Sequence, residues 1–123
     1  MLNKPQQFGK ESESIAVRHL KKSGYKIIEQ NYRNKLGEID IIAKDKDTLV
    51  FIEVKARKSG RFGNPKWAVT PKKQRKISMV ALYYLKISKQ PNVKARFDVV
   101  SILSSEKNPD IEIVKNAFQL AYT

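Results

Sequence analysis

The sequence predicts a single α/β domain: a mixed β-sheet flanked by helices, with elements in the order α-β-β-β-α-β-β. Two segments carry apolar residues at the three- and four-residue spacing of an amphipathic helix. Five others are short runs rich in β-branched and aromatic residues. A chain of 123 residues fits one domain and is long enough to bury a core. We therefore expect helices packed on one sheet.

The N-terminal part of the chain is expected to hold one helix and three strands. Residues 1–9 are polar and are expected to form a flexible N-terminus, followed by a helix over residues 10–23. The apolar stripe of this helix consists of Ala16, Val17 and Leu20, and Gly24 is a typical stop. Strands are then predicted over residues 25–32, 39–43 and 48–56, with polar turns at 34–37 and 45–47.

The C-terminal part is expected to hold a long loop, a second helix and two strands. Residues 57–69 contain two glycines, a proline and several basic residues, and a loop of this length favours a functional role. Thr70 and Pro71 are typical of an N-cap and a first helical residue, and this helix is predicted to run to about residue 88. Strands over 96–103 and 111–117 complete a single domain of residues 10–123.

The net charge of +13 originates in one part of the sequence. Residues 55–97 contain 13 Lys and Arg residues and no Asp or Glu, whereas basic and acidic residues balance in the rest of the chain. Such segregation on a folded domain indicates a polyanionic partner, with nucleic acid as the main expectation. Two alternatives stay open: a solvated basic face that keeps the protein soluble, and an anionic membrane surface.

The composition excludes several classes of protein. Without cysteine there are no disulfides and no thiolate metal sites, and a cytoplasmic location is expected. No apolar run approaches the ~18 residues of a membrane span, and residues 1–10 lack the apolar core of a secretory signal. His19 is the only histidine, so Ser/His/Asp and Cys/His catalysis lack support.

The strand predicted over residues 48–56 contains two charged residues among apolar ones. Side chains alternate along a strand, so Phe51, Glu53 and Lys55 share one face. A carboxylate in a strand buried on both faces is costly unless it is paired or binds something. The alternative is a strand end that emerges into water, with Glu53 and Lys55 as an exposed ion pair.

Asp40 favours the interpretation of a binding site. It lies 13 residues before Glu53, the length of one hairpin, in another apolar strand. Two carboxylates about 5 Å apart repel by roughly 3 kcal/mol at an effective dielectric constant near 20, and a divalent cation removes that cost. Oxygen ligands without His or Cys select Mg²⁺ or Mn²⁺. Lys55 could then orient an attacking water or stabilise developing negative charge.

Three further acidic residues are weaker candidates. Glu13 lies on the apolar stripe of the first helix, either as a third carboxylate of the site or as a residue that favours the helix dipole. Glu11 in the same turn is expected in solvent. Asp98 follows Arg96 in an apolar strand and is expected to form a structural ion pair rather than to bind a metal.

These residues belong to a longer series of sequence motifs that resembles the YraN-like family. That family lies within the PD-(D/E)XK nuclease superfamily, which also includes Holliday-junction resolvases. The matching segments span about residues 9–118: Glu13-x-x-Ala16, Gly24-Tyr25, Asn31-Tyr32-Arg33, Gly37-Glu38-Ile39-Asp40, Phe51-Ile-Glu53-Val-Lys55-x-Arg57, Phe62-Gly63, Arg96-Phe97-Asp98-Val99-Val100 and Asn116-Ala117-Phe118. Ser12 departs from the pattern, standing where the family usually has glycine.

The resemblance implies a restriction-endonuclease-like fold and specific roles. Asp40 and Glu53 would be metal ligands, Lys55 the catalytic lysine and Glu13 an extra acid on the first helix. Glu38, two residues before Asp40 on the same face, would be an accessory acid. The implied activity is a metal-dependent endonuclease acting on DNA, with branched DNA as one candidate substrate.

A set of basic residues is expected to contact nucleic acid, DNA more than RNA: Arg57, Lys58, Arg61, Lys66, Lys72, Lys73, Arg75 and Lys76. Homodimerisation is left open. Two rival functions remain: a nucleic-acid-binding module that keeps the nuclease-like fold with little catalysis, and an RNA- or ribosome-associated factor that uses the basic segment alone.

Overall fold

The computed structural model describes residues 4–57, 69–90, 92–103 and 109–120, and its elements follow the predicted order. Within these ranges there are two helices and five strands: α1 (Lys4–Lys22), β1 (Lys26–Asn34), β2 (Gly37–Asp45), β3 (Thr48–Arg57), α2 (Pro71–Ile87), β4 (Lys94–Leu103) and β5 (Asp110–Phe118). Neither helix combines the length and the apolar character that a membrane crossing requires.

The helix predicted over residues 10–23 begins earlier than expected, at Lys4. Pro5 suggested an irregular N-terminus, but it falls in the first turn of α1. Proline is tolerated there because the first backbone N–H groups of a helix have no partner within the helix. The start of α2 was predicted correctly: Thr70 is the N-cap, and its side-chain oxygen accepts a hydrogen bond from the Lys73 N–H.

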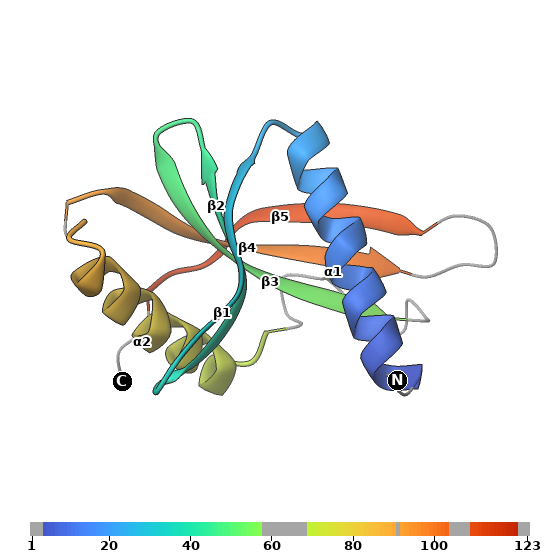
Figure 1. The fold of residues 1–123 in the computed structure, drawn as a ribbon, viewed down its shortest axis with the longest axis horizontal. Helices are drawn as coiled ribbons and strands as arrows, with labels where there is room; N and C mark the ends of the chain where they lie inside the picture. The colour runs from blue at the N-terminus through green and yellow to red at the C-terminus, as the bar shows by residue number, and fades with distance from the viewer. Residues whose placement is uncertain (1–3, 58–68, 91, 104–108, 121–123) are drawn as a thin grey trace.

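The five strands form one open sheet in the order β1-β2-β3-β4-β5 (Figure 1). All neighbours are antiparallel except β3 and β4, which are parallel and are connected through α2. The sheet is therefore mixed, as predicted. The crossover through α2 is what allows β3 and β4 to run parallel, since parallel neighbours cannot be joined by a tight hairpin.

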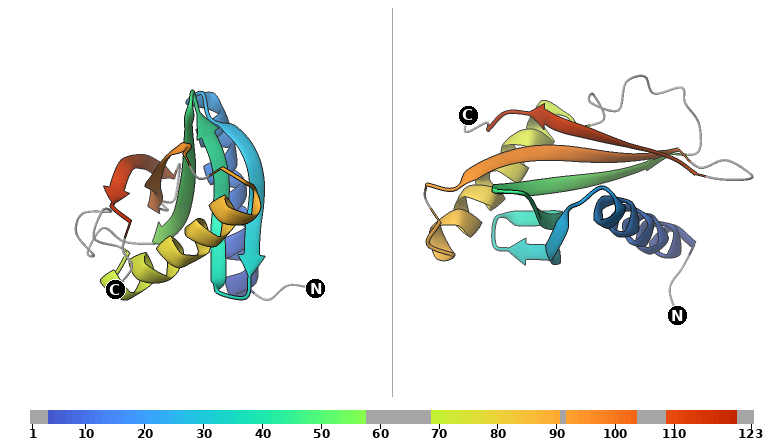
Figure 2. Two further views of the ribbon diagram at one scale, coloured as in Figure 1. Left: turned by 90° about the vertical axis from the view of Figure 1, so that its left-hand side faces the viewer. Right: turned by 90° about the horizontal axis from the view of Figure 1, so that it is seen from above.

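The two helices cover opposite faces of the sheet (Figure 2). Alternation along β3 makes this visible: Leu49 and Phe51 join the apolar cluster under α2, whereas Val50 and Ile52 join the cluster under α1. The α1 stripe of Ala16, Val17 and Leu20 and the α2 stripe of Ile77, Val80 and Ala81 are buried in these clusters. Tyr84 packs edge-on against Tyr32, with ring centroids 5.1 Å apart.

A fork opens between β2 and β3 at one end of the sheet. The two strands are paired from Asp45↔Thr48 to Ile41↔Ile52 and no further. β2 stays paired with β1 as far as the turn at Gly37, while β3 continues beside β4 as far as Arg57. The backbone of β3 beyond Ile52 therefore loses its β2 neighbour, and the side chains at this point face an opening.

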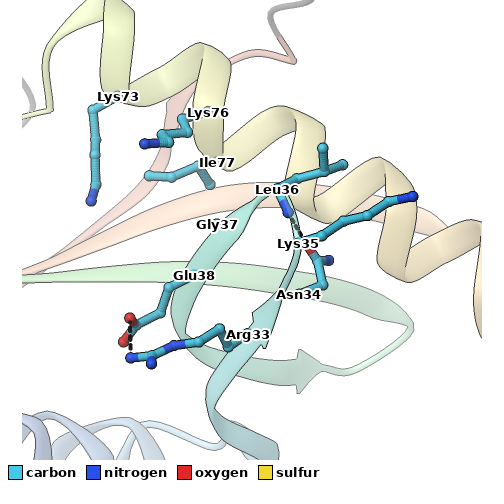
Figure 3. A pocket seen from close by; sticks show the side chains of 9 residues that line it. All are labelled: Arg33, Asn34, Lys35, Leu36, Gly37, Glu38, Lys73, Lys76 and Ile77. Atoms are coloured by element: carbon cyan, nitrogen blue, oxygen red, sulfur yellow. Dashed lines mark hydrogen bonds and ion pairs between the residues drawn. The ribbon is translucent and has the colours of Figure 1, made fainter.

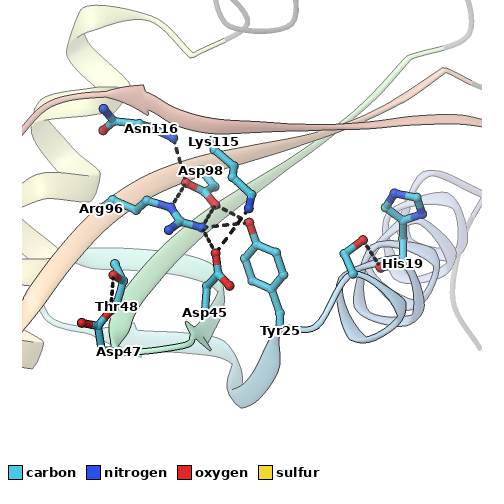
Figure 4. Close-up of polar contacts among 10 residues, drawn as sticks. His19, Tyr25, Asp45, Asp47, Thr48, Arg96, Asp98, Lys115 and Asn116 are labelled. Atoms are coloured by element: carbon cyan, nitrogen blue, oxygen red, sulfur yellow. Dashed lines mark hydrogen bonds and ion pairs between the residues drawn. The ribbon is translucent and has the colours of Figure 1, made fainter.

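A network of polar side chains connects β4 to β2, to β5 and to Tyr25, which precedes β1 (Figure 4). The fully buried Asp98 accepts hydrogen bonds from Arg96 Nε at 2.9 Å, from the Tyr25 hydroxyl at 2.8 Å and from the Asn116 N–H at 2.9 Å. Arg96 also bonds Asp45 at 2.7 Å. Burial and the Asp98 carboxylate raise the pKa of Tyr25, so its hydroxyl stays a donor. The prediction that Asp98 is a structural partner of Arg96 is confirmed.

Candidate functional site

A cavity of about 370 Å³ lies between α1 and the fork. Four residues singled out from the sequence line it: Glu13 from α1, Asp40 from β2, and Glu53 and Lys55 from β3. The remaining lining residues are Gly9, Ser12, Val54 and Ala56. Helix α1 and the two strands of the β2–β3 hairpin thus bring their charged side chains to one opening.

Glu53 is the buried acid of this site, with only 7% of its surface exposed. The ammonium groups of Lys55 and Lys73 each lie 3.8 Å from its Oε1 atom. Burial, followed by the negative charge of Asp40, raises the pKa of Glu53 to about 7, although the two lysines act in the opposite direction. A carboxyl group in this environment binds a proton near neutral pH, and a nearby cation would stabilise its charged form.

Asp40 bridges the fork from β2 to the backbone of β3. Its Oδ2 atom accepts a hydrogen bond from the Val54 N–H at 2.8 Å, so a side chain satisfies the backbone group that a paired strand would otherwise satisfy. Burial raises the pKa of Asp40, and this hydrogen bond opposes the rise. The bond fixes the carboxylate of Asp40 beside the β3 residue that follows Glu53.

Glu13 joins the two strand carboxylates from the helix side. Burial raises its pKa, the charge of Asp40 raises it further, and a side-chain hydrogen bond with Asn31 lowers it. Asn31, which the sequence analysis gave no role, lies in β1 with a positive φ of 54°. Asparagine adopts this conformation more readily than most residues, which is the signal that could have drawn attention to it.

Glu38 lies outside this cavity and lines a neighbouring cleft (Figure 3). Its Oε2 atom pairs with Arg33 across the β1–β2 hairpin at 2.9 Å. Its charge still contributes to raising the pKa values of Glu13, Asp40 and Glu53. Glu38 therefore acts on the site at longer range than its spacing from Asp40 had suggested.

Comparison with known sequences assigns the chain to a family. Residues 12–102 match the sequence model of the "Uncharacterised protein family UPF0102". Proteins called UPF0102 protein are similar over nearly the whole chain. One from Desulfosudis oleivorans is 51% identical, covering 96% of this chain and 94% of its own. One from Geobacter metallireducens is 52% identical, covering 93% of each chain. The chain belongs to the UPF0102 family. This confirms the family resemblance seen in its motifs.

The basic residues of this UPF0102 protein that were predicted to contact nucleic acid divide into three groups. Lys72, Arg75 and Lys76 are exposed on α2, and Arg57 is half-buried at the end of β3. Lys58, Arg61 and Lys66 lie outside the described residues. Lys73 was expected to contact nucleic acid, and the structure places it at Glu53, a contact that sequence spacing could not show because it joins α2 to β3.

The donor set of the UPF0102 site fits a hard divalent cation. Within residues 4–57, 69–90, 92–103 and 109–120, no cluster of three or more His, Cys, Asp or Glu residues suited to a metal is found. Mg²⁺, however, is commonly held by one or two carboxylates, with waters and substrate oxygens completing its shell. Asp40 and Glu53 supply such a pair, and their mutual repulsion is the cost that a cation would relieve.

Proposed function

We propose that this protein hydrolyses phosphodiester bonds of DNA as a Mg²⁺- or Mn²⁺-dependent endonuclease, with branched DNA among its candidate substrates. The observation that carries the proposal is the pairing of Asp40 with the buried Glu53 at the fork, beside Lys55 and Lys73. Carboxylates made costly by burial and repulsion, with cations beside them in an open cavity, are typical of a catalytic site.

Each residue has a task that follows from its place. Asp40 and Glu53 would hold the metal ion, which supplies Lewis-acid polarisation of the phosphate and a bound water of lowered pKa. Lys55 and Lys73 lie beside Glu53 and would stabilise the negative charge that develops on the phosphate oxygens. Glu13, with its raised pKa, is suited to hold or release a proton at the cavity wall.

The surface around the cavity supports a polyanionic substrate. Lys72, Arg75 and Lys76 are exposed on the same helix that brings Lys73 to Glu53. Together they provide the sequence-independent phosphate attraction on which nucleic-acid affinity depends. The expectation of a nucleic-acid partner, DNA more than RNA, is part of the proposal.

A second candidate is a nucleic-acid-binding module without catalysis. It is favoured by the two lysines at 3.8 Å from Glu53, which already offset part of its charge without a metal. A cleavage assay separates the two functions. Duplex, single-stranded, flap and four-way-junction DNA, and matching RNA, are incubated with the protein in Mg²⁺, Mn²⁺ or EDTA.

Metal-dependent cleavage that is lost in Asp40→Asn supports the nuclease. Binding without cleavage of any substrate in either metal supports the module.

A further inference from the structure

A second cleft of about 420 Å³ lies between the turn of the β1–β2 hairpin and the first turns of α2 (Figure 3). We refer to it as the turn cleft. Four of its lining residues are cations: Arg33, Lys35, Lys73 and Lys76. Among the residues that the structure describes, Glu38 is the only acid in its lining. A cleft of this size can take a small ligand group, and its charge selects an anion.

The turn cleft is built rigidly. The Asn34 side-chain oxygen accepts a hydrogen bond from the Leu36 N–H at 2.8 Å, which fixes the turn. Gly37, with a φ of +151°, brings the hairpin against α2 so closely that a Cβ atom there would lie 3.1 Å from Val80 Cγ2. The turn and α2 therefore approach closely before any ligand binds. Lys73 and Lys76 lie on one side of the cleft, whereas the Lys35 side chain extends along α2 in the opposite direction, towards Tyr83 (Figure 3).

The charges inside the turn cleft do not cancel. Arg33 is paired with Glu38, and Lys73 faces Glu53. Among the residues that the structure describes, no ion pair involves Lys35 or Lys76; the Lys35 ammonium lies 5.6 Å from the centre of the Tyr83 ring. Lys76 is one helical turn from Lys73, so both side chains reach over the cleft from the same side of α2.

Lys73 connects the turn cleft to the carboxylate site. It lines the cleft, and its ammonium lies 3.8 Å from Glu53 Oε1. An extended polyanion lying along this part of α2 would pass from the carboxylate site directly over Lys76. The two cavities are thus arranged as neighbouring positions for successive groups of one chain.

We infer that the turn cleft binds a backbone phosphate of the nucleic-acid strand that enters the carboxylate site, at a linkage next to the one that is cut. The inference rests on the proposed function and adds the position of a flanking phosphate to it. Lys76 holds this phosphate with Lys73 beside it, and Arg33 borders it. The strand is thereby anchored on the hairpin side of the scissile bond.

The test measures binding in the Asp40→Asn protein, so that cleavage does not interfere. The probe is a short fluorescein-labelled single-stranded DNA in which each phosphate in turn is replaced by an uncharged methylphosphonate. One replacement should lower affinity about tenfold, as expected for the loss of a charge-assisted contact. Adding Lys76→Gln should lower affinity similarly, make that one replacement silent, and reduce the slope of log K against log salt by about 0.7.

The matched control carries Lys86→Gln, which changes an exposed lysine near the C-terminal end of the same helix that lines neither cavity. It should retain the full methylphosphonate effect. If the two substitutions behave alike, or if the losses add at every linkage, the turn cleft binds no particular phosphate and the inference is overturned.

The outcomes for the two proposals are distinguishable. If the unmodified protein cuts DNA while Lys76→Gln binds like the control, the nuclease proposal stands and the turn cleft proposal fails. If the unmodified protein cuts nothing while one linkage depends on Lys76, the binding position stands and the nuclease proposal fails.

Discussion

Replacing Glu53 with glutamine should stabilise the metal-free protein, which is unusual for a buried polar residue. The pKa of Glu53 is raised from 4.5 to about 7, and at about 1.4 kcal/mol per pKa unit this corresponds to at most about 3 kcal/mol. The folded state binds the proton more tightly than the unfolded state does. Glu53 is therefore no burden below pH 4.5, and its ionisation costs stability increasingly as the pH rises towards about 7.

Glutamine keeps the shape of the side chain and cannot ionise. Lys55 and Lys73 lose a partner, but both ammonium groups have access to water, with side-chain exposures of 36% and 44%, so the cost of their loss is small. Urea unfolding in EDTA, followed by circular dichroism from about pH 4.5 to pH 8, should show a falling stability in the wild type that flattens in Glu53→Gln. The difference should approach about 3 kcal/mol at the alkaline end.

Two comparisons make the reasoning refutable. Glu112→Gln removes an exposed carboxylate on β5 and should leave the pH profile of the wild type unchanged. Mg²⁺ should stabilise the wild type, by about 2.7 kcal/mol at a concentration one hundred times its dissociation constant, and should do little for Glu53→Gln. If the free energy of unfolding depends on pH in the same way in the wild type and in Glu53→Gln, burial and the charge of Asp40 do not control the ionisation of Glu53.

Three further predictions concern individual residues of the network and the site. Lys55→Ala should bind DNA within about twofold of wild type yet lose ~10²–10³ in cleavage rate, measured in single-turnover reactions; unchanged cleavage would remove its catalytic role. Asp40→Asn should abolish the rise in melting temperature that millimolar Mn²⁺ produces in the wild type, and an equal rise in both proteins would place the metal elsewhere. Asp98→Asn should cost about 3–5 kcal/mol in urea unfolding because it leaves Arg96 without its buried partner, while the Mn²⁺ effect on melting persists; a loss below about 1 kcal/mol would show that Asp45 alone satisfies Arg96.

The sequence predicted the strands and their faces well because alternation is a local property. Leu49 and Phe51 pack under α2 whereas Val50 and Ile52 pack under α1, as their alternation required, and Asp40 and Glu53 come to one site because a single hairpin connects their strands. Helix α1 was predicted to begin too late because a proline in the first turn resembles one in a loop.

The contacts that the sequence did not reveal are those that depend on how distant elements pack. Lys73 reaches Glu53 only because α2 crosses the β3 face, and no spacing within either element encodes that approach. Glu38 has the spacing of an accessory acid, yet Arg33 on the neighbouring strand holds it in the turn cleft. Which side chains meet across the fork depends on the residue at which β2 and β3 stop pairing. The alternation of apolar residues does not reveal that residue.

The parallel pairing of β3 with β4 has a consequence for how the protein folds. Asp40 and Glu53 are 13 residues apart in one hairpin, whereas Glu53 is paired with Val99, 46 residues later. Local contacts close before distant ones, so the chain brings two negative charges together before Lys73 and β4 arrive to offset and bury them. The β2–β3 hairpin alone should then be short-lived. The carboxylate site should become ordered only when α2 and β4 pack against β3. Pulsed hydrogen exchange at the Val54 amide, which Asp40 protects, would report that order directly.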